Sequence, residues 1–492
     1  MQTRRDQLQA YRFVTRRVMA ALLHGEPDTP ESPMRKLVVA TFSGVMVAVL
    51  AVAAFGVWGL LKPGGGAQSI EDPGTLLIEK ETGTRYVFNQ QDHMLHPMLN
   101  YTSARLYLNS DTITERTVSR ESLSRYRRGV TLGIPGAPES LPDAGSLVSR
   151  PWSVCSRMER SASGTPRSTV TLLAGRDPGG TGIGQNEAVV VRAGVDQYWV
   201  IWHNQRLLAD QTTIKVFTVA QEPPVGPAWL NSLPAGPDFK PPHLAGLGDP
   251  ASFQLNGVTP LVGQVFTADI VSGGKKYYVA LTDGLAPVWE TEVALMFGDP
   301  STRTAYPGKN PTAIPVDPAS ANTHLSPTSV SNSALPHTLP TPATLSDGDS
   351  TTLCATYPDP KNKPNQIRVT QVGNIPTLSD RNSGAVGTAT DTGSVDQVIL
   401  PPGEGALVGL VPGPDQLDRV QTYYLVTEQG QRFPFRSPEL VARLGYDTGS
   451  AVPLQSNLLG LIPDGPILDT GAAGTPVQIV PRQAPATSPS TG

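Results

Sequence analysis

The feature that most constrains this chain is a run of 25 residues without a charged side chain, which begins at Leu37 and ends at Leu61. About 20 apolar residues in a helix span a bilayer, so this run can cross one with some tilt. Lys36 and Lys62 bracket it, and Trp58 lies near its far end, as interfacial anchors do. A signal peptide has a shorter apolar region and a small-residue cleavage site. The sequence therefore predicts one retained transmembrane helix over residues 37–61.

Basic residues on the two sides of this helix predict its orientation. Residues 1–36 contain seven Lys and Arg residues, whereas Lys62 is the single basic residue within fifteen positions beyond the helix. The positive-inside rule places such an N-terminus in the cytoplasm. Residues 62–492 are then extracytoplasmic (periplasmic), with 31 basic and 38 acidic residues and a formal charge of −7. We expect a single-pass protein of the cell inner membrane.

The cytoplasmic segment, residues 1–36, is predicted to form a basic amphipathic helix. Arg12, Arg16 and Arg17 flank a stripe of apolar side chains at helical spacing. The stripe consists of Leu8, Tyr11, Val14, Val18 and Leu22. Such a helix either lies on an anionic leaflet or docks on a partner protein, and both alternatives keep it at the membrane. The three arginines are therefore the predicted membrane or partner contacts.

A second contact is predicted within the span. Ala40, Gly44 and Ala48 follow one another at four-residue spacing. Small residues at this spacing allow another transmembrane helix to approach closely. We expect this stripe to face a neighbouring helix.

Composition bounds the rest of the fold. Gly and Pro each occupy 48 of the 492 positions, which argues against a helical bundle and for short strands, turns and long connections. The hydrophobic fraction of 39% is enough for packed cores. A nucleic-acid-binding domain normally has a basic pI, whereas the pI here is near 6.0, so we expect no nucleic-acid partner.

The chain has two cysteines, Cys155 and Cys354, both in the predicted extracytoplasmic region. An even number of cysteines in an oxidising compartment is typical of a disulfide. This bond would close a loop of about 200 residues. Two unpaired buried thiols are the alternative, and a metal site would need further ligands.

One pattern recurs four times in the extracytoplasmic region. A strand with paired aromatic or apolar residues is followed by a turn, a second strand, a short helix and a proline-containing turn. The four strands begin at Tyr86, Tyr198, Tyr277 and Tyr423. In the first copy the helix is expected near residues 120–128. Each copy is too small to hold a core alone, so four copies suggest a modular arrangement.

Runs rich in β-branched residues between the copies predict a further β-rich domain. These runs cover residues 169–173, 187–192, 253–270 and 398–411. Residues 319–349 are rich in Ser, Thr and Pro, which predicts a flexible excursion or linker. We expect an α+β fold with one N-terminal transmembrane helix. An elongated extracytoplasmic region of four small β-hairpin/helix repeats around a β-rich central domain should follow it.

The predicted boundaries begin with the cytoplasmic helix (1–36) and the transmembrane helix (37–61). The later segments, in order, are a linker with repeat 1 (62–150), the first segment of the central domain (151–197), repeat 2 (198–240), the second segment of the central domain (241–273), repeat 3 (274–320), the Ser/Thr/Pro-rich excursion with the third segment of the central domain (321–420), repeat 4 (421–474) and a disordered tail (475–492).

Several long motifs point to one family. QTRRDQLQAYRFVTRRVMAALL precedes the span, and LHPMLNYTSARLYL is followed by TLGIPGAP. Three more are NEAVVVRAGVDQYWV, PLVGQVFTADIVSGGKKYYVALTDGLAPV and YYLVTEQGQRFPFRSPELVARLGY. Over nearly its whole length the chain resembles EccB, a component of actinobacterial type VII (ESX) secretion systems. It departs from the family mainly in its short N-terminus and its Ser/Thr-rich excursion.

The resemblance implies a single-pass protein with four repeats, a central β-rich domain and one disulfide. It also implies a place in the inner-membrane secretion complex, with EccC, EccD and EccE as partners. We further expect self-association through the extracytoplasmic region.

Members of this family are described as ATPases, so the resemblance raises the question of a nucleotide site. A P-loop needs GxxxxGK[ST], with the Lys reaching the phosphates. The nearest stretch is LLAGRDPGGTGIG, in which Gly175 and Gly180 have the matching spacing and Thr181 follows. The Lys is absent and no helical pattern follows, so these three residues are candidates by spacing alone. We expect no other cofactor.

Two further patterns are not expected to carry chemistry. Asp-Thr-Gly begins at Asp391, Asp447 and Asp469, but an aspartic protease needs two carboxylates that share a proton, and the last copy leaves no room for a lobe after it. His93 and His96 lack a third ligand nearby. We identify no catalytic residue and no metal site.

The sequence thus favours a structural and assembly component that links the cytoplasmic and membrane machinery to an extracytoplasmic scaffold for protein export. Two alternatives remain open. One is an ATPase subunit of the same system, suggested by the family description. The other is a cell-wall-binding membrane anchor, suggested by the long Gly/Pro-rich external repeats.

Overall fold

The computed structural model describes residues 4–25, 34–61, 70–110, 112–160, 166–218, 222–270, 273–346, 351–373 and 393–477. The chain divides into two compact units, Met1–Asp72 and Pro73–Gly492. The predicted tail lies outside the described residues from residue 478 onward.

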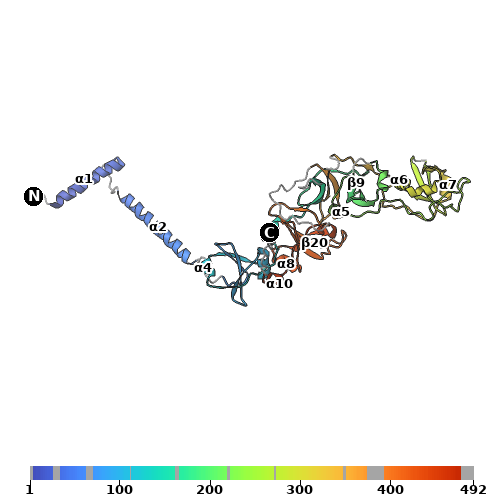
Figure 1. Cartoon of the computed structure of the whole chain (residues 1–492). Helices are drawn as coiled ribbons and strands as arrows, with labels where there is room; N and C mark the ends of the chain where they lie inside the picture. Colours follow the sequence, from blue (N-terminus) through green and yellow to red (C-terminus); the bar gives the residue numbers. More distant parts are fainter. Residues whose placement is uncertain are drawn as a thin grey trace, which may run out of the picture. The chain divides into compact units, whose positions relative to one another are not determined.

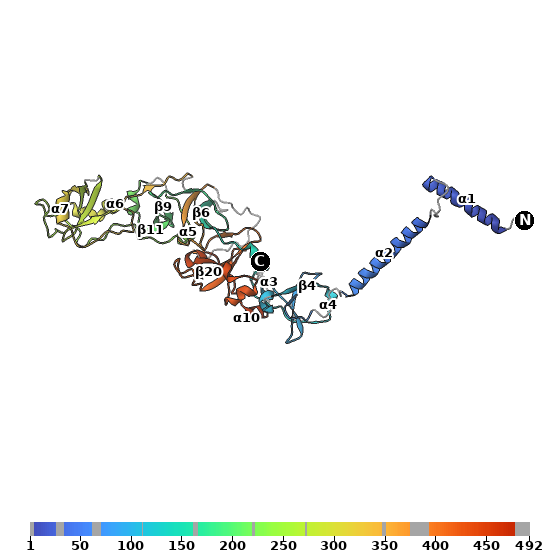
Figure 2. The ribbon, with the colours of Figure 1, turned by 180° about the vertical axis from the view of Figure 1, so that it is seen from behind.

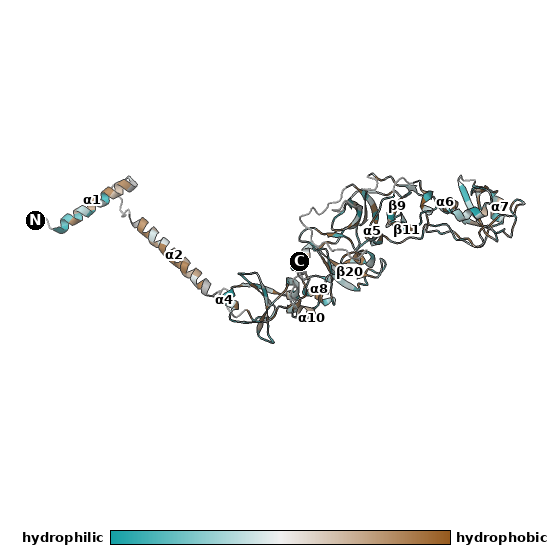
Figure 3. Ribbon diagram, viewed as in Figure 1, coloured by the Kyte–Doolittle hydropathy of each residue, from teal (hydrophilic) through white to brown (hydrophobic). Residues whose placement is uncertain are grey.

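The first unit contains two helices, α1 (Arg4–His24) and α2 (Met34–Leu61) (Figure 1). Within α2, Leu37–Trp58 is long and apolar enough to cross a membrane, and no other described helix has this property. Figure 3 shows the hydrophobic colour along most of α2, whereas the N-terminal half of α1 is hydrophilic. The predicted span is therefore a continuous helix.

Four sheets in the described residues of the second unit share one strand order. Each has three consecutive antiparallel strands, and a later strand pairs in parallel with the first of them. The first sheet contains β1 (Thr75–Glu79), β2 (Arg85–Asn89), β3 (Met94–Pro97), β4 (Thr114–Val118) and the extra strand β5 (Arg127–Arg128). The second contains β9 (Glu187–Ala193), β10 (Gln197–Trp202), β11 (Gln205–Ala209) and β16 (Thr341–Pro342).

The third sheet contains β12 (Val265–Asp269), β13 (Lys275–Ala280), β14 (Leu285–Val288) and β15 (Ile314–Pro315). The fourth contains β20 (Gly405–Val411), β21 (Thr422–Thr427), β22 (Arg432–Pro434) and β23 (Val452–Gln455). The paired-aromatic strands of the sequence pattern are the second strand of each sheet, namely β2, β10, β13 and β21.

Local sequence explains these hairpins. In β10, Tyr198 and Val200 are buried among the core of the second sheet, as alternation in a strand requires. A two-residue turn, His203-Asn204, then joins β10 to β11 with positive φ angles of 47° and 61°. Turns of this kind match the twist of the flanking strands, and Asn tolerates the left-handed conformation.

A fifth sheet has six strands in the order β19-β7-β6-β17-β18-β8. Its strands are β6 (Trp152–Arg160), β7 (Pro166–Ala174), β8 (Thr181–Gly182), β17 (Thr352–Tyr357), β18 (Arg368–Val372) and β19 (Gln397–Ile399). The segments that supply its strands differ from those predicted for the β-rich central domain. Its predicted second segment, residues 241–273, gives it no strand, because β12 pairs with β13 in the third small sheet. Likewise β9 and β20, predicted as central strands, open small sheets.

Short helices lie between strands of the small sheets and in the segments that join or follow the sheets. They are α3 (Tyr101–Leu108), α4 (Arg120–Leu123), α5 (Pro227–Ser232), α6 (Glu290–Gly298), α7 (Pro318–Thr323), α8 (Glu439–Arg443), α9 (Ser456–Leu459) and α10 (Thr470–Ala473). The helix predicted near 120–128 is wrong in extent, because α4 stops at Leu123 and β5 follows. The main helix of this region is α3, where the Asn100 side chain caps the first turn by accepting from the Ser103 N–H at 2.8 Å.

Shared cores join elements far apart in sequence. Leu106 of α3 packs in one core with Leu425 of β21 and Val441 of α8. Trp152 and Trp229 lie in the core that joins the six-stranded sheet to α5 and to the second and fourth small sheets. Helix α3, which lies between β3 and β4 of the first small sheet, therefore packs in the core of the last small sheet.

The Ser/Thr/Pro-rich segment is not a free linker over residues 319–346. β16 pairs with β9, and Leu335 is buried in the core of the second sheet. The buried carboxylate of Glu292 on α6 accepts hydrogen bonds from the Ser331 hydroxyl and from the Asn332 N–H, at 2.6 and 2.7 Å. Strand pairing, a buried leucine and hydrogen bonds to Glu292 thus hold in place a segment whose composition alone predicts flexibility.

Candidate functional site

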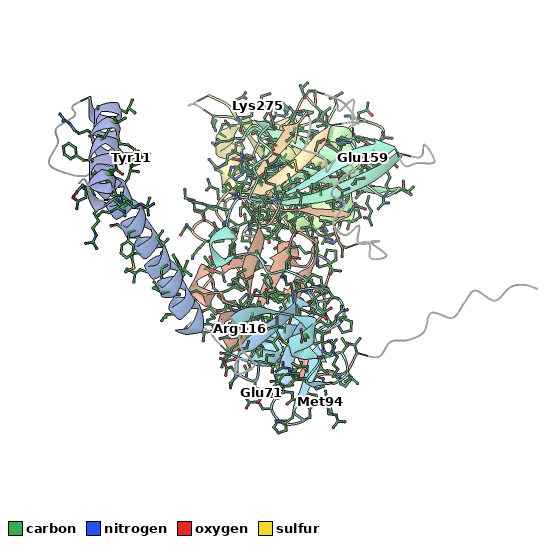
Figure 4. All side chains as sticks on the ribbon, turned by 90° about the vertical axis from the view of Figure 1, so that its left-hand side faces the viewer. Tyr11, Glu71, Met94, Arg116, Glu159 and Lys275 are labelled. Atoms are coloured by element: carbon green, nitrogen blue, oxygen red, sulfur yellow. A yellow bond between two sulfur atoms is a disulfide. The ribbon has the colours of Figure 1, made fainter. Side chains whose placement is uncertain are left out.

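The basic residues of α1 lie on an exposed helix surface. Arg12, Arg16 and Arg17 are exposed, and the Arg17 guanidinium lies 5.8 Å from the ring centre of Phe13. The apolar stripe is exposed as well, from 52% at Val18 to 81% at Leu22. Figure 4 shows the Tyr11 ring projecting from this helix. An exposed surface that is both apolar and cationic suits an anionic membrane surface or a partner protein.

The small residues of α2 lie on one stripe. Ala40, Gly44 and Ala48 succeed one another at intervals of four residues within the helix, and a Cβ added at Gly44 would meet no atom within 4 Å. The stripe is therefore open to another helix.

Cys155 and Cys354 form a disulfide across 199 residues of sequence. They are directly opposite each other on the antiparallel strands β6 and β17, and both are fully buried. The bond ties the early and late segments of the six-stranded sheet together.

The glycine-rich stretch has a packing explanation. Gly175 and Gly180 have backbone φ angles of +74° and +95°, which residues other than glycine rarely adopt. A Cβ at Gly175 would collide with Val148, and one at Gly180 with the carbonyl oxygen of Gln371. Thr181 begins β8, which pairs with β18. These three residues hold a strand connection, and no helix N-terminus follows them to receive a phosphate.

The same stretch is pinned to β18 by side chains. Asp177 accepts from Arg368 at 2.7 Å and from the Gly179 N–H at 2.9 Å. The Thr370 hydroxyl donates to the Gly179 carbonyl oxygen at 2.9 Å. The carboxylate of Asp177 is thus committed to structure.

Other sequence candidates also have local roles. Asp447 accepts from the Gly449 N–H, and Asp469 caps α10 by accepting from the Ala472 N–H at 3.2 Å. Asp391 lies outside the described residues. His96 is buried, and its two ring nitrogens lie 2.9 Å from the Val130 carbonyl oxygen and 2.8 Å from an Asp92 carboxylate oxygen.

Comparison with known proteins identifies the family. The family model for "Type VII secretion system ESX-1, transport TM domain B" (EccB) matches residues 1–482. A relative from Mycolicibacterium smegmatis, named "ESX-3 secretion system ATPase EccB3", is 26% identical over 99% of this chain and 92% of its own length.

Two solved structures share the fold. A chain of the periplasmic assembly from an ESX-5 inner membrane complex matches with a TM-score of 0.64 and 24% identity, covering 86% of this chain and 100% of that chain. The EccB3 dimer from an ESX-3 core complex matches with a TM-score of 0.61 and 23% identity, covering 81% and 99%. With the family model matched over almost the entire sequence, this chain belongs to the EccB family of type VII secretion membrane components.

Proposed function

We propose that this chain is the EccB-type anchor of a type VII secretion complex in the inner membrane. It links the cytoplasmic and membrane machinery to an extracytoplasmic scaffold for protein export. The observation that carries the proposal is the division of the chain into a unit with an exposed apolar helix and a unit with its own cores, in a member of this family. The chain acts through surfaces rather than through a catalytic residue.

The N-terminus is cytoplasmic and the second unit is extracytoplasmic. Two observations support this orientation. Seven basic residues precede the span, and the two cysteines of the second unit are paired, as in an oxidising compartment. Protease added outside cells with a permeabilised envelope should digest the second unit and spare residues 1–36. Protection of the second unit would reverse the orientation.

The four small sheets are four copies of one repeat, and the six-stranded sheet is the central domain. The shared strand order supports this interpretation. Exchanging the β13–β14 hairpin for the β21–β22 hairpin should leave a folded chain, because the first strand of each hairpin pairs antiparallel with the strand that precedes it. Complete unfolding of this chimera would argue against equivalent copies.

The partners are EccC-, EccD- and EccE-type components and other copies of this chain. A dimer of a relative, EccB3 from an ESX-3 core complex, supports self-association. Affinity purification of the tagged chain from membranes, followed by mass spectrometry, tests the partner set. Recovery of the chain alone and as a monomer, under conditions that keep other membrane complexes intact, would contradict it.

An ATPase is the second candidate, because the M. smegmatis relative bears that name. The decisive variant is Thr181→Val, since Thr181 is exposed, whereas Gly175 and Gly180 cannot be changed without strain. We expect the Thr181→Val chain to secrete nearly as well as the wild type. If the folded and assembled variant loses both secretion and nucleotide hydrolysis, the ATPase function replaces the anchoring one.

A further inference from the structure

A cavity of about 430 Å³ lies in the second unit. The turn between β9 and β10, residues 193–197, lines one side of it, and Pro227, Leu230 and Asn231 of α5 line another. β9 and α5 are neighbours in both Figure 1 and Figure 2. Trp199 and Arg206, from the two strands of the β10–β11 hairpin, complete the lining.

Arg206 brings a positive charge to this cavity, which also has the carboxylate of Asp196 in its lining. Its Nη1 donates to Oδ1 of Asn231 at 2.8 Å, and its guanidinium carbon lies 5.2 Å from the ring centre of Trp199. Within the described residues no carboxylate forms an ion pair with it. Burial disfavours the charged form and lowers the pKa of Arg206. The guanidinium is therefore held in place by neutral groups, and its charge remains available to a ligand.

Two N–H donors beside the cavity are also unused. Nε of Arg206 and Nε1 of Trp199 are buried and have no acceptor among the residues that the structure describes. Because the protein itself covers these two nitrogens, a ligand in the cavity would meet the terminal guanidinium nitrogens of Arg206 instead. A carboxylate supplies acceptors without donors, and it matches the forked geometry of a guanidinium.

The rest of the lining narrows the class of ligand. Asp196, on the exposed turn, would repel a small free anion. Trp199, Pro227 and Leu230 offer apolar contacts. A carboxylate carried by a peptide fits this lining better than a free anion, because its neutral amides and an apolar side chain add contacts that offset the repulsion by Asp196.

We propose that this cavity binds a carboxylate of an acidic peptide segment from a partner protein. Arg206 is the cation that pairs with the carboxylate, and the ring of Trp199 packs against the apolar part of the peptide. Binding by the purified full-length chain does not depend on assembly. Failure of this proposal is therefore distinguishable from failure of the anchoring role.

The test uses the six tryptophans of the chain as reporters. The full-length chain is purified in detergent with ¹⁵N-labelled tryptophan, and the Trp199 indole signal is assigned with Trp199→Phe. The probes are an acetylated Ala-Leu-Glu-Ala amide, its Gln counterpart, and an acetylated Ala-Leu-Ala peptide with a free terminal carboxylate. We expect a saturable shift of the Trp199 signal with the Glu peptide, and binding of the Gln peptide weaker by about tenfold. Stronger binding of the free-acid peptide also supports the site, and assigns it to a chain terminus.

Matched variants keep the result falsifiable. Arg206→Gln should weaken binding about tenfold, and Arg206→Lys should restore some of the loss. Asp196→Asn, at an exposed turn, should tighten it. The signals of Trp152 and Trp229, both fully buried, report whether the fold is intact. Equal shifts with the Glu and Gln peptides, no saturable shift up to about 10 mM in a folded chain, or weaker binding by Asp196→Asn would overturn the proposal.

Discussion

The two units of this protein use the same kinds of residue in opposite ways. In α2, Phe42 and Phe55 leave 69% and 79% of their surface exposed, whereas Leu76, Trp152 and Phe433 of the second unit are fully buried by their own chain. The second unit therefore obtains its hydrophobic stabilisation internally. The first unit must obtain it from lipid or from other proteins, because the described residues of α2 have nothing of their own unit to cover them.

This difference teaches that stability and assembly are separable here. Changes in the first unit should alter what the chain binds and leave the second unit folded. Changes in the second unit should alter its stability before they alter membrane insertion.

The largest effect is expected from charge reversal on α1. Replacing Arg12, Arg16 and Arg17 by Glu removes three exposed cations and adds three anions beside the apolar stripe. We expect the amount of chain that co-purifies with the other membrane components to fall at least tenfold, because like charges oppose docking on an anionic surface. Quantitative mass spectrometry of the purified complex measures this.

The control carries the same reversal on the second unit, at the exposed residues Arg125, Arg127 and Arg436. It should retain the complex. The melting temperature of the second unit should match the wild type in the α1 variant. A lower melting temperature, or equal loss of the complex in the control, would mean that the two units are not separable in this way.

Loss of the disulfide should destabilise the second unit alone. The bond closes a loop of 199 residues, for which loop-entropy models give roughly 5 kcal/mol as an upper expectation. In the Cys155→Ala/Cys354→Ala chain, we expect amides of β6 and β17 to exchange with solvent markedly faster than those of the first small sheet, β1–β3. Hydrogen exchange with mass spectrometry resolves these segments. Uniform acceleration would show that the six-stranded sheet and the small sheets unfold as one.

A smaller effect is expected at the glycine-rich loop. Gly179 and Gly180 both have positive φ, but a Cβ at Gly179 meets nothing within 4 Å, whereas one at Gly180 collides with the Gln371 carbonyl oxygen. Gly179→Ala should cost about 1 kcal/mol of unfolding free energy through backbone strain. Gly180→Ala should cost at least about 1 kcal/mol more. Denaturant titration measures the unfolding free energy of the two variants, and their difference gives the effect of the collision at Gly180. Equal losses of unfolding free energy would mean that the loop can shift to relieve the collision.

Sequence reasoning succeeds where local pattern decides structure. The apolar run predicts α2, and the strands at Tyr198, Tyr277 and Tyr423 are β10, β13 and β21. Alternation and turn residues are local signals, so the hairpins are visible in the sequence. The disulfide is expected from the even cysteine count and the predicted extracytoplasmic compartment.

Pairing between distant segments is not visible in this way. β16 is two residues long and lies about 150 positions after its partner β9, so no local pattern marks it. β9, β12 and β20 have the composition of central strands, and their pairing alone assigns them to the small sheets. The Arg206 cavity could not be predicted from the sequence for the same reason, since Trp199 and Asn231 come together only in the folded chain.

The smallest effect concerns acid and Glu79, a buried carboxylate on β1. Hydrogen bonds from Thr82 and then from Arg120 lower the pKa of Glu79 below its usual value of 4.5. A lowered pKa in the folded state stabilises the fold above the unfolded-state value, and this stabilisation is lost as the pH falls from about 4.5 through the lowered pKa. The melting temperature of the second unit should therefore fall less steeply with acid in Glu79→Gln than in the wild type. Glu121→Gln, at an exposed carboxylate of α4, should follow the wild-type curve. Identical curves of melting temperature against pH for all three chains would show that Glu79 does not contribute. If Glu79→Gln also changed the acid stability of α1 or α2, the two units would not be separable.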